Sequence, residues 1–259
     1  MNFEDVDFTK DPNYVRGDIT PTGEKFAGIR EYGDEVPTIE ESDWKGLVDK
    51  MEEDGGGAER LIVNVFNQRN EGSCVANACA QAMQIVQARQ FGKANVTKLS
   101  AMSLYKRIGS GPNSGASVND GLSELKARGI LPLDTPENKA KYEHTFPATG
   151  WSNKLPSGWE DVGKRFKAVE WFVLRGLDQM MTALLHEHPV VVGRSGHSIC
   201  YCKPTYKSGK LGVTYVNSWG DWGFGAGDFT SGFGFDSLSM VKSAASWAFC
   251  VRAVTDPAG

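Results

Sequence analysis

The sequence lacks any apolar run that approaches the roughly 20 residues needed to span a bilayer. Its beginning, MNFEDVDFTK, is acidic and has no basic stretch followed by an apolar one, so we expect no secretory signal. Cysteines are few: there are five, an odd number without the spacing of a compact disulfide scaffold. These features predict a cytoplasmic protein that does not contact membranes, with association to a virion as an alternative.

An excess of positive charge is also lacking. The net charge is -4 at pH 7, so we expect no general attraction to nucleic acid. Residues 1–60 hold 17 acidic and 7 basic side chains, whereas residues 61–259 hold 15 acidic and 21 basic ones. We interpret residues 1–58 as an acidic leader or arm. It is a solvated and partly ordered segment, an arm docked on the basic body of the chain that could hold the activity off, or a handle for a partner such as a larger assembly.

Hydrophobic spacing divides the remainder, residues 59–259, into two lobes, at about 67–165 and 166–259. The predicted helices cover residues 43–53, 74–90, 100–108, 118–128 and 176–188. The predicted strands cover residues 61–66, 190–192, 197–201, 211–216 and 247–251. Residues 131–165 and 224–235 read as loops rich in Pro, Gly and polar residues. A helical first half followed by antiparallel strands predicts an α+β fold with a groove between the lobes.

Three residues carry groups suited to nucleophilic catalysis. Cys74 stands where a polar loop meets the longest helix, and free N–H groups at a helix start favour a thiolate. A lone cysteine there is more often structural, so the argument needs partners. His197, in SGHSI, opens a strand next to a glycine and is suited to act as a base. Asn217, in VNSWG, offers a carboxamide that can orient an imidazole.

Taken together, these segments resemble the papain-like cysteine peptidases. Gln68 lies six residues before Cys74, in NQRNEGSC, at the spacing of that family's glutamine loop. The block from Asn217 to Gly220, NSWG, is followed by a second Trp-Gly pair, and the chain order Cys, His, Asn agrees with the family. The resemblance runs from about residue 61 to the C-terminus. It implies two lobes: a helical one with a central nucleophile helix, and an antiparallel β-barrel-like one.

The resemblance also implies a role for each matching residue. Cys74 would attack the scissile carbonyl, His197 would be base and proton donor, and Asn217 would orient His197. Gln68 and the Cys74 backbone N–H would form the oxyanion hole. Protein or peptide is the implied substrate, with Trp219 on the leaving-group side and Gly115 against the substrate backbone. We expect no cofactor and no metal, since Cys200 and Cys202 have no evident histidine or acidic partners.

Three departures from the family leave alternatives open. Val75 stands where an aromatic residue is usual, Glu71 stands where extracellular members have a cysteine, and residues 1–58 show no recognisable helical propeptide. The leading hypothesis is an endopeptidase that works through an acyl-enzyme. An alternative is a catalytically silent module with a binding or structural role in a larger assembly, for example a viral one. A third is an acyltransferase or amidase with the same residues.

Overall fold

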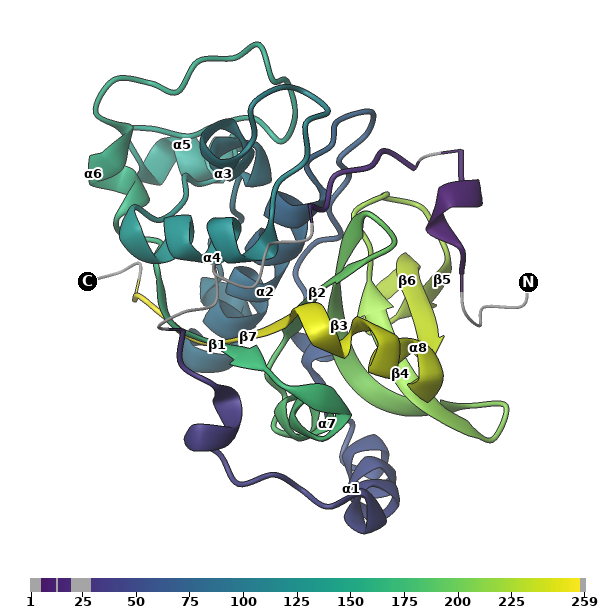
Figure 1. Cartoon of the computed structure of the whole chain (residues 1–259). Coiled ribbons are helices and arrows are strands. Elements are labelled where there is room, and N and C mark those ends of the chain that lie inside the picture. The colour runs from purple at the N-terminus through teal and green to yellow at the C-terminus, as the bar shows by residue number, and fades with distance from the viewer. Residues whose placement is uncertain (1–5, 13, 20–28, 257–259) are drawn as a thin grey trace.

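A computed structural model gives the structure of residues 6–12, 14–19 and 29–256. Five helices follow one another in a helical region (Figure 1): α2 (Cys74–Phe91), α3 (Ala101–Ile108), α4 (Val118–Ala127), α5 (Pro136–Lys141) and α6 (Trp159–Gly163). The later part of the chain forms the strands β1 (Ala168–Leu174), β2 (Val190–Arg194), β3 (His197–Lys207), β4 (Lys210–Val216), β5 (Phe224–Ala226), β6 (Phe229–Ser237) and β7 (Ala248–Val254). The prediction of an α+β fold is confirmed.

These strands form one sheet in the order β1-β7-β2-β3-β4-β6-β5, and all neighbouring strands are antiparallel. β3 begins at His197, and its neighbour β4 ends at Val216, which is paired with Cys200. In an antiparallel pair, one strand begins where its neighbour ends. Residues 197 and 217 therefore lie close together at the same end of these two strands. The strands themselves therefore bring two distant sequence blocks together.

Helix α2 is buried on every side from Cys74 to Ala88. It lies between α3 and α4 on one side and the strands β3 and β7 on the other. A helix enclosed in this way needs small side chains for close approach, and alanines at positions 76, 78, 80 and 82 supply them. Gly92, with φ 87°, ends the helix. The rigid core thus holds the start of α2 in place.

Part of the acidic leader packs against the back of the sheet region. Helix α1 (Glu41–Glu53) buries Trp44 and Val48 and contacts α7 (Gly176–Leu185). The Trp44 indole N–H donates to the carbonyl of Ile39, 3.0 Å away. In the described part of the chain, no helix combines the length and apolar character needed to cross a membrane.

Three sequence-based assignments are wrong. Residues 61–66 form no strand, because Leu61 ends a 3-10 helix (Ala58–Leu61) and residues 62–66 pair with no strand among the described residues. Residues 131–165 contain α5 and α6, and residues 224–235 contain β5 and most of β6. In β6, Gly234 lies directly against the ring of Tyr215 on β4, so the glycine that suggested a loop makes room for a neighbouring ring. A further helix, α8 (Leu238–Ala244), follows β6.

Candidate active site

Cys74 is the first residue of α2, and its side chain is fully buried. Burial, and after it the nearby Asp18 carboxyl, raise the pKa of the thiol well above its usual value. Backbone N–H groups of Ser198, Val75 and Cys74 itself bond to the sulfur and act in the opposite direction. The sulfur is therefore a neutral thiol in this state, and three N–H groups are already placed to stabilise a thiolate.

His197 is hydrogen-bonded to Asn217. Its Nε2 lies 2.8 Å from the Asn217 Oδ1, and the same oxygen accepts the Ser218 backbone N–H at 2.7 Å. The atom facing the ring is therefore an acceptor, which assigns the proton of a neutral imidazole to Nε2 and leaves Nδ1 free to take a proton. Burial lowers the pKa of His197 to about 4, and the bond to Asn217 opposes this shift. Trp219 stacks on the imidazole, with ring centroids 4.7 Å apart.

Gln68 is fully buried and is tied to the same segment. Its side-chain oxygen accepts the Ser218 hydroxyl at 2.6 Å, and its backbone N–H donates to the Ser218 carbonyl at 2.8 Å. The Gln68 amide nitrogen donates to the Glu71 carbonyl at 2.9 Å. Because the Glu71 carbonyl can only accept, the atom that faces it must be the amide nitrogen, so the orientation of the Gln68 amide is defined, with its second N–H not used by these bonds.

The chain's own leader lies against the sulfur of Cys74. Gly17 approaches so closely that a Cβ atom on it would stand 2.6 Å from the sulfur. The Gly17 carbonyl accepts the Ala116 N–H at 2.9 Å, and the Ile19 N–H donates to the Ala116 carbonyl at 2.8 Å. Gly115, predicted to contact the substrate backbone, lies directly against Gly17. An extended peptide does run past this glycine, and it is the leader itself.

The other side of the leader is bonded to the turn between β2 and β3. The Gly196 carbonyl accepts the N–H groups of Gly17 and Asp18 at 2.9 and 3.0 Å. The Tyr14 hydroxyl donates to the Ser195 carbonyl at 2.9 Å. Residues 14–19 therefore bridge the helical region and the sheet, and in Figure 1 the purple N-terminal trace passes between them.

Phe8 covers the imidazole. Its ring is fully buried and meets four aromatic rings, those of His197, Tyr215, Trp219 and Trp222, and one guanidinium among the described residues. Centroid distances are 4.8 Å to His197, 5.6 Å to Trp219 and 6.4 Å to Trp222. The Arg194 guanidinium lies 4.2 Å from the ring centroid, a cation–π contact. Together with residues 14–19, Phe8 shields Cys74 and His197 from solvent.

Two polar contacts hold the same part of the leader. Arg194 donates to the Val6 carbonyl at 2.6 Å and pairs with the buried Asp236 at 2.6 Å. The Trp222 indole N–H donates to the Asp11 carboxylate at 2.9 Å. Trp222 belongs to the second Trp-Gly pair of the sequence, so this block contributes to holding the leader.

The sequence pointed to most of the residues gathered here, but it left a docked leader as one alternative among several and did not predict which leader residues lie at the site. Its stretch from Phe8 to Asp18 shows no helical periodicity and no motif, and the signal for Gly17 is nil, since one glycine among thirty carries no information. Ser218 was visible only as part of NSWG, without a role of its own. The functional roles of all the predicted site residues remain predictions: Cys74, His197, Asn217, Gln68, Gly115 and Trp219.

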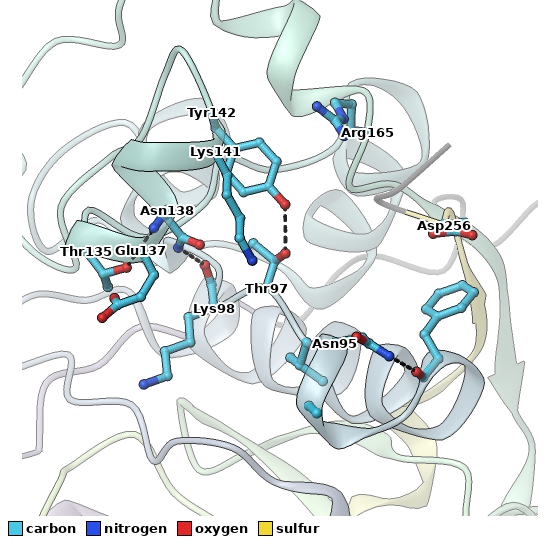
Figure 2. Close-up of a pocket in the computed structure, with 13 residues that line it drawn as sticks. Asn95, Thr97, Lys98, Thr135, Glu137, Asn138, Lys141, Tyr142, Arg165 and Asp256 are labelled. Atoms are coloured by element: carbon cyan, nitrogen blue, oxygen red, sulfur yellow. Dashed lines mark hydrogen bonds between the residues drawn. The ribbon is translucent and has the colours of Figure 1, made fainter.

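A surface pocket of about 860 Å³ lies elsewhere, on the helical region (Figure 2). Two hydrogen bonds cross its wall: the Tyr142 and Thr97 hydroxyls are 3.0 Å apart, and the Asn138 amide donates to the Lys98 carbonyl at 3.0 Å. None of the predicted catalytic side chains lines it. A large cavity is the usual first candidate for a site, but here the predicted catalytic groups lie in a region that the leader fills.

Comparison with known proteins gives matches in structure and none in sequence. No protein-family profile matches the chain, and no curated protein matches it. Among solved structures, xylellain, a cysteine protease from Xylella fastidiosa, matches with a TM-score of 0.64 at 17% identity, covering 93% of this chain and 96% of that one.

Two further matches are proforms. Procathepsin L2 proteinase from the larval midgut of Tenebrio molitor gives a TM-score of 0.61 at 18% identity, covering 98% of this chain and 83% of its own. ProCathepsin B from Trypanosoma congolense gives 0.52 at 12% identity, covering 90% and 81%. Structural likeness at this level of identity demonstrates the fold. The chain has the fold of the papain-like cysteine proteases.

Proposed function

We propose that the chain is a cysteine endopeptidase that its own leader holds latent. One observation supports the chemistry above all others. His197 uses Nε2 to bond Asn217, while its Nδ1 has no hydrogen-bond partner among the described residues. The next residue, Ser198, bonds the Cys74 sulfur through its backbone N–H. The base and the thiol are thus brought to one place by consecutive residues.

The first half of the reaction transfers an acyl group to sulfur. The Cys74 proton moves to Nδ1 of His197, and the thiolate attacks the scissile carbonyl. The carbonyl oxygen becomes an oxyanion, which the Gln68 amide N–H and the Cys74 backbone N–H would stabilise, at about 3 kcal/mol of barrier for each donor. The imidazolium then protonates the departing amine, and a thioester remains on Cys74.

The second half of the reaction hydrolyses the thioester and regenerates the free enzyme. Neutral His197 takes a proton from water, the hydroxide attacks the thioester, and the thiol is restored as the carboxylic acid leaves. Asn217 keeps the Nε2–H of the ring occupied throughout, so only Nδ1 exchanges protons with the thiol. Trp219, stacked on the ring, keeps water away from this bond.

The direction of the leader explains why it would block the site rather than be cut. The amine must leave toward His197, so the part of a substrate that follows the scissile bond lies on the His197 side. Phe8, which precedes Gly17 in the chain, occupies that side. The leader therefore runs opposite to a productive substrate. Two of the similar structures are, by name, proforms of cathepsins, which is in keeping with a latent state.

The second candidate is a silent module with a binding role. A fully buried thiol whose pKa is raised, and an imidazole whose pKa is lowered to about 4, favour it as long as the leader stays in place. The two candidates differ in what happens when the leader moves away. An enzyme gains a reactive thiolate, whereas a silent module keeps an inert thiol.

The test displaces the leader in the full chain. In Gly17→Val the new side chain collides with the Cys74 sulfur and the Gly72 carbonyl, so the leader must leave. We expect iodoacetamide to label Cys74 at least about tenfold faster than the four other buried cysteines, because only Cys74 has a base and N–H groups that favour the thiolate. We also expect internal cleavage of a peptide library, read by mass spectrometry.

Controls separate the alternatives. Gly46→Ala changes a leader glycine whose Cβ would meet nothing within 4 Å, and it should leave the chain latent. Cys74→Ser in the Gly17→Val background should abolish cleavage. Uncut peptides, together with Cys74 labelling that His197→Ala does not slow, would establish the silent module. Products that carry an added amine would indicate acyl transfer instead of hydrolysis.

A further inference from the structure

A small cavity lies between α2 and the edge of the sheet that carries Asn217. Its wall is made of buried residues only, and its space open to a water-sized sphere is about 10 Å³. That volume is close to the minimum that holds one water molecule. The wall is formed by Phe66, Asn77, Ala78, Gln81, Ser198, Ile199, Val216, Asn217 and Ser218. The cavity therefore borders directly on the residue that orients the imidazole.

Two carboxamides on this wall have polar atoms without a hydrogen-bond partner among the described residues. They are both amide atoms of Gln81 and the Nδ2 of Asn217. Gln81 and Asn217 are each only 3% exposed. Buried polar atoms of this kind are almost always satisfied by a protein group or by an ordered water, because leaving them unpaired is costly.

The serine hydroxyls of the wall do not supply the partner. The Ser198 hydroxyl donates to the Val192 carbonyl at 3.0 Å, and the Ser218 hydroxyl donates to Gln68 at 2.6 Å. The Gln81 oxygen, by contrast, is an acceptor on the same cavity as the Asn217 amide nitrogen. A water in between can accept from the Asn217 N–H and donate to the Gln81 oxygen.

We propose that Gln81 is a positioning residue for the catalytic asparagine and acts through one buried water in this cavity. The inference rests on the proposed function, in which Asn217 orients His197. Gln81 lies seven residues after Cys74 on α2, hence on the same helix face. The helix that carries the nucleophile thereby also supports the group that orients the base.

The chemical consequence concerns which end of the Asn217 carboxamide faces His197. With Oδ1 toward the ring, Asn217 accepts the Nε2–H and the Ser218 N–H. With the amide reversed, two N–H groups face Nε2, the proton moves to Nδ1, and the base can no longer accept the thiol proton. A water held by the Gln81 oxygen gives the Asn217 Nδ2 an acceptor, so it adds one hydrogen bond to the productive orientation, which the Ser218 N–H also favours.

The experiment uses the full chain and replaces the Gln81 amide with an apolar side chain of similar length. In Gln81→Met, we expect the fraction of the Nε2–H tautomer of His197 to fall, as read by ¹H–¹⁵N NMR of ¹⁵N-histidine protein. In the Gly17→Val background, kcat should fall about fivefold to tenfold with KM unchanged, the effect of one lost hydrogen bond. The midpoint of the pH profile of Cys74 alkylation should move to higher pH, because a base that no longer accepts the thiol proton favours the thiolate less.

Gln87→Met is the matched control. Gln87 lies on another face of α2, is fully buried, and also has an amide nitrogen without a partner among the described residues. Its oxygen accepts the Thr97 N–H at 3.1 Å, away from the catalytic groups. A purely structural role for Gln81 predicts that both variants lower the melting temperature. It also predicts that neither variant changes the His197 tautomer or the pH profile of Cys74 alkylation, and this result would overturn the proposal.

A second measurement on the unchanged chain guards against a variant that does not fold. We expect a nuclear Overhauser contact between a long-lived water and the Asn217 side-chain amide. Its absence would also overturn the proposal. The tautomer and the water contact need no peptidase activity, so a chain that cuts nothing but shows both refutes the proposed function alone. A chain that cuts peptides with an unaltered tautomer in Gln81→Met refutes the role of Gln81 alone.

Discussion

Gly17 of the leader stands against the sulfur of Cys74, with space between them too small for a methyl group. The contact joins the segment with the strongest acidic character to the residue predicted to be the nucleophile. Backbone hydrogen bonds to Ala116 on one side and Gly196 on the other hold Gly17 there. Docking of the leader thus rests on main-chain contacts next to the thiol, and side chains elsewhere in the leader strengthen it.

Phe8 should supply a large part of the docking free energy of the leader. Its ring is fully buried among His197, Trp219 and Trp222, and removing a buried phenylalanine side chain costs about 3–5 kcal/mol. We expect Phe8→Ala to speed hydrogen exchange at the Gly17 and Asp18 amides by roughly a hundredfold or more. Lys10→Ala, at an exposed neighbouring position, should change neither rate, and equal rates in both variants would contradict this role of Phe8.

Asp18 should make docking of the leader depend on pH. Burial raises the pKa of its carboxyl to about 7, and Arg16 opposes this only in part. A side chain on Gly193 would collide with this carboxyl, so the docked site is tight. Since the docked pKa is higher than the usual 3.8, the docked state binds the proton more tightly than the released leader does. Docking therefore weakens as pH rises from about 4 to about 7, by an amount on the order of 4 kcal/mol, and changes little above that.

Asp18→Asn should remove this dependence. Exchange at the Gly17 amide, corrected for its intrinsic pH dependence, should accelerate between pH 4 and 7 in the unchanged chain relative to the variant. Comparing the two chains isolates Asp18, because His197, whose pKa is lowered to about 4, contributes equally to both. If the two chains show parallel pH curves, Asp18 does not control docking.

Gln68 should act on the chemical step. In the Gly17→Val background, we expect Gln68→Ala to lower kcat by about 10²–10³ with little change in KM, the cost of one oxyanion donor. Ser218→Ala should lower kcat less, by about tenfold, because it frees the Gln68 amide to rotate without removing it. Ser243→Ala, at an exposed serine, is the control. Unchanged kcat in Gln68→Ala would remove Gln68 from the catalytic set.

Asp236 should stabilise the sheet region. It is fully buried, pairs with Arg194 at 2.6 Å and accepts the Tyr201 hydroxyl at 2.7 Å. Replacing it with alanine leaves the buried guanidinium without this partner, and we expect a loss of about 3–5 kcal/mol in the free energy of unfolding. Asp228→Ala, which removes an exposed partner of Lys93, should cost less than about 1 kcal/mol. Similar urea midpoints for the two variants would contradict the importance of the buried pair.

The sequence predicted the helices best where their signals are local. The alanine-rich run after Cys74 and the terminating glycine at 92 predicted α2 almost to its last residue. The predictions failed for segments whose secondary structure depends on contacts with distant parts of the chain. The Gly/Phe stretch of β6 read as a loop, because the ring of Tyr215 that fills the place next to Gly234 comes from another strand. Residues 61–66 read as a strand, but Ile62 is buried without pairing to any strand in the described part of the chain.

The sequence alone identified the residues predicted to carry catalytic groups and their order, because Cys74, His197 and Asn217 are recognised by residue type and immediate neighbours. Only the tertiary structure decided that Phe8 and Gly17 of the leader share their site, and that Gln81 and Asn217 face one cavity. The physical reason is that a peptide backbone docks by hydrogen bonds available to any residue, and a cavity is enclosed by side chains from distant segments. Neither the docked backbone nor the cavity therefore produces a recognisable sequence motif in the residues that form it.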